Sequence, residues 1–467
     1  MNALVQIALL GYIPISLLFF AVLPAPRAVA SVLIMGWLFL PPAVSFSLPG
    51  LPDYDKYFAI AFAAVFGAVV FDSGRVFSFR PAWYDIPMLL FTILPGLTSL
   101  SNGLGLNDCI STIFRQTTYF AIPYTLARIY FSNLSGLRDL TLVVFVSGLI
   151  YLPFVAYELR FSPQLNRLLY GYHQHSFGQT RRYGGWRPMV FMQHGLMLSL
   201  WMCSATVAGL LLWMSGSVRR IMQIPIGVLV GALALVSIAC RSFGAMLLMV
   251  MAMVFAYLAR QLKLPVLITL LALLPVAYVG LRATELWDGS QMVSISNAIA
   301  GGERAGSLDF RFRSENILND RAWQRPLLGW GGHNRNRGEA GDAAASRLIV
   351  DSWWIILFGQ RGLLGLGTWL LAMVLPIVLF IHRWKVWAVW HPWLMPGLAL
   401  CLITLVFVID CMFNAMLNPL YVVCAGALAG LMPNRQLIAQ MQAAITPPRP
   451  VQQPVQQALP TSTTQPT

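Results

Sequence analysis

Long apolar runs follow one another along almost the whole chain, separated by short polar loops. The runs are continuous rather than alternating, and roughly 17–25 apolar residues in an α-helix cross about 30 Å of hydrocarbon. Because a bilayer offers the backbone no hydrogen-bond partners, such segments cross it as helices. We therefore predict an all-α polytopic integral membrane protein with about 12–13 transmembrane helices. The predicted spans are residues 4–22, 29–46, 57–72, 85–100, 110–130, 138–157, 189–213, 221–240, 243–259, 264–281, 350–381, 393–413 and 418–433.

The composition supports this class and excludes others. Hydrophobic residues make up 58% of the 467 positions and charged residues only 10%, which is more apolar sequence than a water-soluble core accounts for. The net charge of +14 would suit nucleic acid, but the basic residues are dispersed among short loops, so we expect no nucleic-acid partner. The six cysteines are scattered without CxxC spacing, so the sequence predicts no disulfide framework, no metal site and no cofactor.

Basic residues of the short loops set the predicted orientation, because they fall in alternate loops and the positive-inside bias puts those loops in the cytoplasm. They are Arg27, Arg75, Arg80, Arg138, Arg219, Arg220, Arg260, Lys263, Arg383 and Lys385. The two long loops, 158–188 and 282–349, then lie on the periplasmic side, the second of them before the last three spans. Residues 1–433 form the membrane domain. The Pro-, Gln- and Thr-rich stretch 434–467 has few apolar residues to bury, so we expect a disordered cytoplasmic tail.

Both periplasmic loops are rich in arginine, against the usual bias, and an anionic ligand is the simplest reason. The stretch “TRRYGGWRPMV” brings Arg182 and Arg187 to the periplasmic start of a span. A guanidinium fork binds phosphate oxygens bidentately and keeps its charge at any working pH. Contact with lipid headgroups is the alternative, with Tyr183 and Trp186 as interface anchors.

Three further arginines are expected on the same side of the membrane. Arg241 lies in “ACRSFGA”, at a predicted periplasmic turn, and Arg115 lies about a turn and a half inside its span from that face. Arginine at membrane depth is costly and usually faces a polar cavity, although a snorkelling side chain is the alternative. Alternating Phe and Arg at 310–313 predicts a short amphipathic helix on the outer surface, and this helix carries Arg311.

Two candidate proton acceptors follow in the second loop and at its end. His333 comes directly after “GWGG”, whose glycines would let the backbone approach a ligand closely. A neutral histidine there can act as a base, although a lone loop histidine is more often simply solvated. Asp351 opens the next span, where it serves either as an N-cap or as a general base that activates a hydroxyl.

The order and spacing of these motifs resemble those of the bacterial O-antigen ligase and exopolysaccharide polymerase superfamily, which are integral-membrane glycan transferases. The resemblance is best over residues 180–381. It rests on “GGWRP”, on “ACRSFGA”, on “RPLLGWGG” in the long loop, and on a polar residue eleven positions before the first glycine of “GLLGL”. Family members usually have His-Asn or His-Ser in that last place, whereas this chain has Asp351 and Ser352. The departure favours an exopolysaccharide polymerase or a divergent ligase-like protein.

The resemblance implies transfer of a glycan from a polyprenyl diphosphate carrier to a hydroxyl of a glycan or lipid acceptor, in the bacterial inner membrane. Arg187 and Arg241 are carried over as diphosphate binders, and we add Arg182, Arg115 and Arg311 to this set. Preorganised arginines can stabilise the charge on the leaving diphosphate without a metal. Membrane lipids and other polysaccharide assembly proteins are the further partners that we expect.

Two other function classes remain open. A polysaccharide transporter or lipid flippase would also need a cationic cavity, but it should carry ionisable residues near the midplane of several helices. Most charges here lie near span ends, and Asp410 is the main deep acid, which favours chemistry at the outer face. A non-catalytic assembly subunit that binds lipid-linked glycan would need the same arginines, so only turnover separates it from an enzyme.

Overall fold

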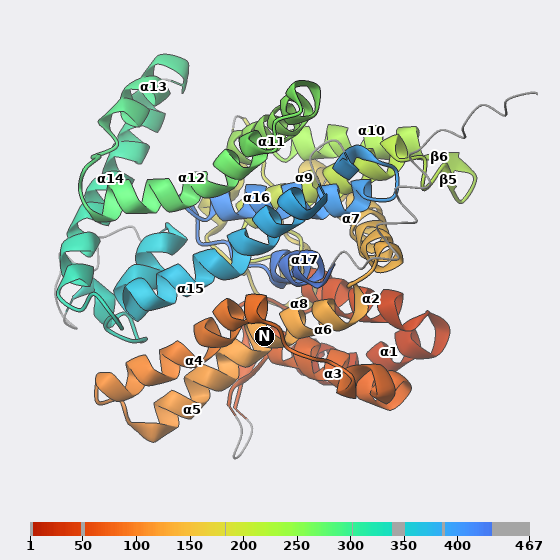
Figure 1. Cartoon of the computed structure of the whole chain (residues 1–467), viewed down its shortest axis with the longest axis horizontal. Coiled ribbons are helices and arrows are strands. Elements are labelled where there is room, and N and C mark those ends of the chain that lie inside the picture. Colours follow the sequence, from red (N-terminus) through yellow and green to blue (C-terminus); the bar gives the residue numbers. More distant parts are fainter. Residues whose placement is uncertain are drawn as a thin grey trace, which may run out of the picture. The chain divides into compact units, whose positions relative to one another are not determined.

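The computed structural model describes residues 3–47, 52–182, 184–300, 302–338, 351–384 and 388–431. The predicted tail, 434–467, and residues 339–349 of the second loop lie outside the described residues. The described chain is mainly helical (Figure 1). Its helices are α1 (Leu4–Val22), α2 (Ala25–Phe39), α3 (Lys56–Phe77), α4 (Ile86–Ser101), α5 (Gly105–Gln116), α6 (Ile122–Tyr130), α7 (Leu134–Phe161), α8 (Leu165–Tyr170), α9 (Gly195–Met214), α10 (Ile226–Ala239), α11 (Phe243–Leu262), α12 (Val266–Ala283), α13 (Ser290–Ala300), α14 (Gly302–Trp323), α15 (Trp353–Trp384), α16 (Met395–Asp410) and α17 (Pro419–Gly430).

Three two-stranded antiparallel hairpins connect some of these helices. They pair β1 (Ser45–Phe46) with β2 (Tyr54–Asp55), β3 (Arg181–Arg182) with β4 (Gly185–Trp186), and β5 (Arg220–Ile221) with β6 (Ile224–Pro225). The β3–β4 hairpin lies in the first of the two long loops, directly before Arg187. It therefore carries one of the predicted arginines, Arg182, and leads directly into another, Arg187.

Seven of the described helices are long and apolar enough to cross a membrane, namely α1, α3, α7, α9, α11, α12 and α15. Four shorter apolar helices accompany them, namely α2, α10, α16 and α17. Each predicted span overlaps helix within the described residues, although the bounds differ; α2, for example, ends at Phe39, whereas the predicted span runs to residue 46. The described chain thus has the architecture of an all-α, multi-pass membrane protein.

The central helices are apolar on all sides, which is the pattern of a helix that has no solvent-facing side. Every residue of α16 and of α17 is buried, and α17 packs against α6, α15 and α16 (Figure 1). Peripheral helices instead expose large apolar side chains, for example Leu18 of α1 (65% exposed) and Leu235 of α10 (69% exposed). In water such a surface would promote association, but lipid tails solvate it as well as another helix does.

The predicted span 110–130 is not one regular α-helix. It consists of α5, a π-helical turn at Thr117–Ala121, and α6. Pro123 stands at the start of α6 and has no N–H to donate to the preceding turn, so the regular hydrogen-bond ladder is interrupted there. The hydrophobic pattern predicted helix over these residues but not the π-helical turn, and neither α5 nor α6 is among the described helices that are long and apolar enough to cross a membrane.

The second long loop contains more helix than the single short amphipathic segment that we predicted. It holds α13 and the whole of α14, and α12 extends into it as far as Ala283. Arg282 of α12 and Glu315 of α14 form an ion pair at 3.1 Å, and their side chains are only 2% and 4% exposed. Removing either partner would leave a buried charge uncompensated, so this pair fixes α14 against the membrane helices.

Helix α15 is broken at Gly362, where φ is 65° and ψ is −170°. Four backbone groups that lose helical partners at such a break need new ones, and the segment 326–331 supplies them. It runs alongside the break and exchanges four hydrogen bonds with it: Leu363 N to Pro326 O (2.7 Å), Leu364 N to Leu327 O (3.3 Å), Trp330 N to Gly359 O (2.9 Å) and Gly331 N to Gln360 O (2.9 Å). The “RPLLGWGG” motif is thus a clamp on a discontinuous membrane helix.

Gly329 of this motif allows a close backbone approach, and the approach is to α15. A Cβ at Gly329 would lie 2.5 Å from the backbone nitrogen of Arg361, and one at Gly362 would lie 2.2 Å from the carbonyl oxygen of Leu327. The sequence had suggested a ligand as the approached group. In the structure, the group that Gly329 approaches is the backbone of α15.

Replacing Gly362 by alanine is expected to destabilise the protein by on the order of 3 kcal/mol, because the backbone conformation is essentially restricted to glycine and the added methyl meets Leu327. Gly367→Ala is the matched control, since it lies in the same helix and nothing surrounds its Cβ position within 4 Å. The midpoint of thermal unfolding of the detergent-solubilised protein should fall for the first variant and stay or rise slightly for the second. Equal midpoints would mean that the clamp does not hold the break.

Candidate functional site

Two adjoining pockets, of about 730 Å³ and 150 Å³, lie where α9, α11, α14 and the end of α16 meet. They share Arg187, Leu196, Gly244 and Asn414, so we treat them as one space and name it the arginine cavity. Its other lining residues are Arg181, Arg182, Arg241, Ser242, Phe243, Ala245, Ser296, Ser307, Leu308, Arg311 and Asp410. Four of the five predicted diphosphate binders thus face one cavity.

Arg182 and Arg241 are held together by the β3–β4 hairpin. Register places Arg182 opposite Gly185, and the guanidinium Nη1 of Arg241 donates to the carbonyl oxygen of Arg182 at 2.8 Å. A Cβ at position 185 would lie 2.3 Å from Cζ of Arg241, so any larger residue there would displace this guanidinium from its position under the hairpin. The second glycine of “GGWRP” therefore leaves space for an arginine from another segment.

Arg241 itself occupies a strained backbone conformation in the turn between α10 and α11. Its φ is 56°, in the left-handed region that costs a non-glycine residue roughly 1–2 kcal/mol. Strain of this kind is retained where the surrounding structure fixes it, often at binding sites. Here the conformation turns the chain sharply between two apolar helices and leaves the side chain at the cavity wall.

Arg187 is the most buried of these arginines, with 8% of the residue exposed. Its Nη2 donates to the carbonyl oxygen of Arg241 at 3.4 Å, while its buried Nε has no hydrogen-bond partner among the described residues. Burial, and next the charge of Arg182, lower the pKa of Arg187 to about 10, so the side chain stays charged at neutral pH. A Cβ at Gly195 would lie 2.4 Å from its Cδ, so a glycine again makes room for an arginine. An unsatisfied, charged guanidinium in such surroundings favours an anionic ligand.

Arg311, on α14, connects the cavity to one candidate base. Its Nη2 lies 3.0 Å from Oδ2 of Asp351, and its Nη1 donates to the carbonyl oxygen of Phe413 at 3.4 Å. Helix α15 begins at Trp353, so Ser352 occupies the N-cap position and Asp351 precedes it. The N-cap alternative for Asp351 is therefore wrong by one residue. Its side chain is 42% exposed and is directed to the arginine, not to the helix end.

The residues around Asp351 are fixed by Glu315 of α14. Ser352 Oγ donates to Oε1 of Glu315, Trp354 Nε1 donates to the same oxygen at 3.4 Å, and Arg282 binds Oε2. Burial raises the pKa of Glu315, although the donors from Ser352 and Arg282 oppose that shift. The network holds the start of α15, and hence Asp351, on a rigid support. Sequence reasoning missed Glu315, because only the partners brought by the fold distinguish it from any other helical glutamate.

Asp410 and Asn414 complete the cavity wall. Asp410 ends α16 and is buried, and Asn414 Nδ2 donates to its Oδ1 at 2.8 Å. Sequence reasoning had identified Asp410 as a deep acid but gave it no role in the site, and Asn414 was not considered. The signal that could have found both is the “DCMFN” spacing, which places an amide four residues after a buried acid at a helix end.

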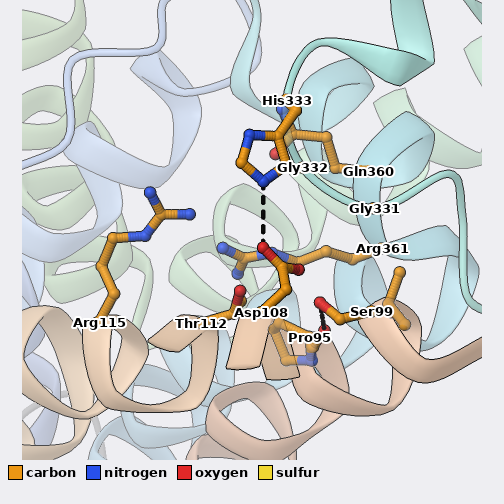
Figure 2. Close-up of a pocket in the computed structure, with 11 residues that line it drawn as sticks. Pro95, Ser99, Asp108, Thr112, Arg115, Gly331, Gly332, His333, Gln360 and Arg361 are labelled. Atoms are coloured by element: carbon orange, nitrogen blue, oxygen red, sulfur yellow. Dashed lines mark hydrogen bonds and ion pairs between the residues drawn. The ribbon is translucent and has the colours of Figure 1, made fainter. Parts of the chain in front are cut away.

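Arg115 and His333, the other two predicted site residues, lie in a different pocket of about 70 Å³ (Figure 2). Nε2 of His333 lies 3.0 Å from Oδ1 of Asp108, and Arg361 faces the same space. Neither Arg115 nor His333 lines the arginine cavity. The fold therefore divides the predicted residues into two sets, with Asp351 beside the larger cavity and His333 in the smaller pocket.

Comparisons with known proteins supply no further guide to the site. No protein-family model matches the chain, and no curated protein matches it. A fold class alone does not define an activity, so function has to be argued from the geometry and charge of the cavity.

Proposed function

We propose that the chain is a glycosyltransferase of the O-antigen ligase and polymerase type, which moves a glycan from a polyprenyl diphosphate carrier to a hydroxyl acceptor. The observation that carries this proposal is the arginine cavity, and above all the buried Arg187, whose Nε has no partner among the described residues. Five arginines and two carboxylates, Asp410 and Asp351, leave a formal charge of +3 at this site. A diphosphate is the anion that suits such a cluster, because guanidinium groups bind its oxygens bidentately.

The chemistry makes one bond and breaks one. The acceptor oxygen attacks the anomeric carbon of the donor glycan, and the bond between that carbon and the diphosphate oxygen breaks. The electron pair leaves with the diphosphate, where Arg187 and Arg241 stabilise the charge that develops in the transition state. Arginines in fixed positions carry out this task without a metal ion, so the proposal requires no cofactor.

The acceptor hydroxyl must lose a proton as it attacks, and we assign this step to Asp351. Its carboxylate is partly exposed, as a group that meets an incoming acceptor must be, and Arg311 holds it at 3.0 Å beside the cavity. Asp410 is the alternative base, since it lines the cavity directly.

The proposal includes a membrane orientation. About 12–13 helices cross the bacterial inner membrane, and the arginine cavity opens on the periplasmic side, where lipid-linked glycans are polymerised and ligated. The long loops that hold β3–β4 and α14 then lie outside the cytoplasm.

A cysteine at Ser307, an exposed position of α14, is expected to react with a membrane-impermeant thiol reagent in intact cells. Met222→Cys is the control on the opposite side, because Met222 is 91% exposed in the β5–β6 hairpin, next to basic residues predicted to be cytoplasmic. The six native cysteines are buried, so background labelling should be low. Labelling of position 307 only after lysis would reverse the orientation and remove the cavity from the periplasm.

The activity is tested with the purified full-length protein, a polyprenyl-diphosphate-linked glycan and a candidate acceptor, by following release of the polyprenyl diphosphate. Glycan transfer supports the proposal, whereas binding of the donor without turnover would make the chain a transporter or an assembly subunit. The glycans of a deletion strain then separate the two enzyme types. Single repeat units left on the carrier indicate a polymerase, and full-length polymer left on the carrier indicates a ligase.

A further inference from the structure

The smaller pocket, which we name the Arg361 pocket, lies beside the break in α15 and is bounded by α4, α5 and the residues that follow the clamp (Figure 2). Arg115 rises from α5 and Arg361 enters from α15, while His333 and Asp108 face each other across the space. The remaining lining residues are Pro95, Thr98, Ser99, Thr112, Gly331, Gly332 and Gln360. The pocket shares none of its lining residues with the arginine cavity.

Arg361 is the residue of this pocket that indicates an anionic ligand. The residue is only 8% exposed, its Nη1 donates to the amide oxygen of Gln116 at 3.2 Å, and its guanidinium lies 4.9 Å from the ring centre of Phe91. Among the described residues, no carboxylate forms an ion pair with it. A buried guanidinium without a counter-ion is costly to keep, and an oxyanion in the pocket would supply the missing charge.

The other charged groups leave the pocket cationic. Burial would raise the pKa of Asp108, but hydrogen bonds from Ser99 and His333 outweigh it and hold that pKa below its usual range. The carboxylate is therefore ionised and engaged by His333 at 3.0 Å. Two guanidinium groups against one carboxylate give a formal charge of +1, which becomes +2 when His333 is protonated.

The backbone that carries Arg361 is stiff. The residue directly precedes the break at Gly362, and the four hydrogen bonds of the clamp fix the chain on both sides of it. The clamp is itself tied to α4, because Thr98 Oγ1 donates to the carbonyl oxygen of Leu328 at 2.8 Å and Asn102 Nδ2 donates to that of Gly329 at 3.0 Å. A side chain held in this way is preorganised for binding.

We propose that the Arg361 pocket is a second anion site, which binds one phosphate group between Arg361 and Arg115. A cavity needs roughly 10–15 Å³ to take one water, so about 70 Å³ accommodates the five heavy atoms of a phosphate but not a lipid-linked glycan. Asp108 holds His333 at the rim, where a protonated imidazole adds a further donor to the anion. The site is separate from the proposed transferase site, and its existence does not depend on that function.

Binding of inorganic phosphate to the purified full-length protein, measured by calorimetry in zwitterionic nanodiscs, tests the proposal. Arg115→Gln should lower the affinity for phosphate roughly tenfold at one class of site, which is the usual effect of losing a charge-assisted hydrogen bond. Arg115 is exposed, so this variant should fold. Asp108→Asn should instead raise the affinity for phosphate at the same class of site, because it removes the carboxylate that repels the anion. A purely structural role for these residues would not produce a gain in affinity.

Two further variants separate this site from the rest of the protein. Arg160→Gln removes an exposed arginine outside both pockets and should leave phosphate binding unchanged, and Arg187→Gln should leave this class of site intact. If Arg187→Gln abolished all binding while Arg115→Gln and Asp108→Asn had no effect, phosphate would bind only in the arginine cavity and the proposal would be wrong.

Changing the lipid of the nanodiscs distinguishes a lipid headgroup from a soluble phosphate as the natural ligand. If nanodiscs that contain phosphatidic acid lower the apparent phosphate affinity of the wild-type protein at this site, the natural ligand is a lipid headgroup. An unchanged affinity in those nanodiscs identifies a soluble phosphate. Either result supports the site, because both require the tenfold difference between the wild type and Arg115→Gln.

Discussion

Replacing Arg241 or Arg187 by alanine is expected to lower the rate of glycan transfer by about a hundredfold or more, because each change removes a guanidinium aimed at the charge that develops on the leaving diphosphate. Lysine should rescue either position poorly, since it lacks the planar fork that holds two oxygens at once. The measurement is transfer of lipid-linked glycan in membranes that contain matched amounts of each protein.

The control is Arg313→Ala. Arg313 lies on α14, two residues from Arg311, but its side chain is 75% exposed and pairs with Asp309 at 2.7 Å, away from the cavity. The Arg313→Ala protein should transfer glycan at a near-normal rate.

Gly185→Ala adds a steric test, because its Cβ would displace the guanidinium of Arg241 without removing it. This variant should show an intermediate loss of the transfer rate. Near-normal polymer output from Arg241→Ala at normal protein levels would exclude this cavity as the diphosphate site.

Replacing Asp351 by asparagine is expected to reduce transfer by roughly a hundredfold to ten-thousandfold, the range typical of losing a general base. Asparagine keeps the shape of the side chain and can still accept a hydrogen bond from Arg311, so folding should be preserved. The start of α15 does not depend on this residue, since Ser352 and Glu315 fix it. The readout is glycan transfer with the donor saturating, so that weaker donor binding does not contribute.

Asp309→Asn is the matched control, because it makes the same change in another arginine–aspartate pair, Arg313 and Asp309 of α14. It should retain activity. His333→Ala should be the milder lesion, since His333 lies in the Arg361 pocket with Asp108. An active Asp351→Asn protein beside an inactive Asp410→Asn protein would move the base to the end of α16. An inactive His333→Ala protein beside an active Asp351→Asn protein would make the Arg361 pocket the catalytic one.

Hydropathy identified the helices because the free energy of burying a run of apolar residues in lipid depends on that run alone. The span at 195–214 and the buried helix α16 are of this kind. The irregularities inside helices were harder to predict from the sequence. The π-helical turn lies directly before Pro123, a residue that the sequence shows, but the interruption at Gly362 depends on the backbone partners that residues 326–331 supply. A partner from another segment leaves no mark on the hydrophobic pattern.

The sequence by itself determined which residue types are available beside the apolar segments: arginines near the ends of predicted spans, one histidine after “GWGG”, and an aspartate ahead of α15. These are local properties of charge and spacing. Only the tertiary structure decided which of them meet, because helix packing brings together positions that are far apart in the chain. Arg311 reaches Asp351, whereas His333 pairs with Asp108, 225 positions away, and so joins Arg361 instead of the arginine cavity. The division of these residues between two pockets is a consequence of how α14 and the clamp pack against α15, and no pattern along the sequence encodes it.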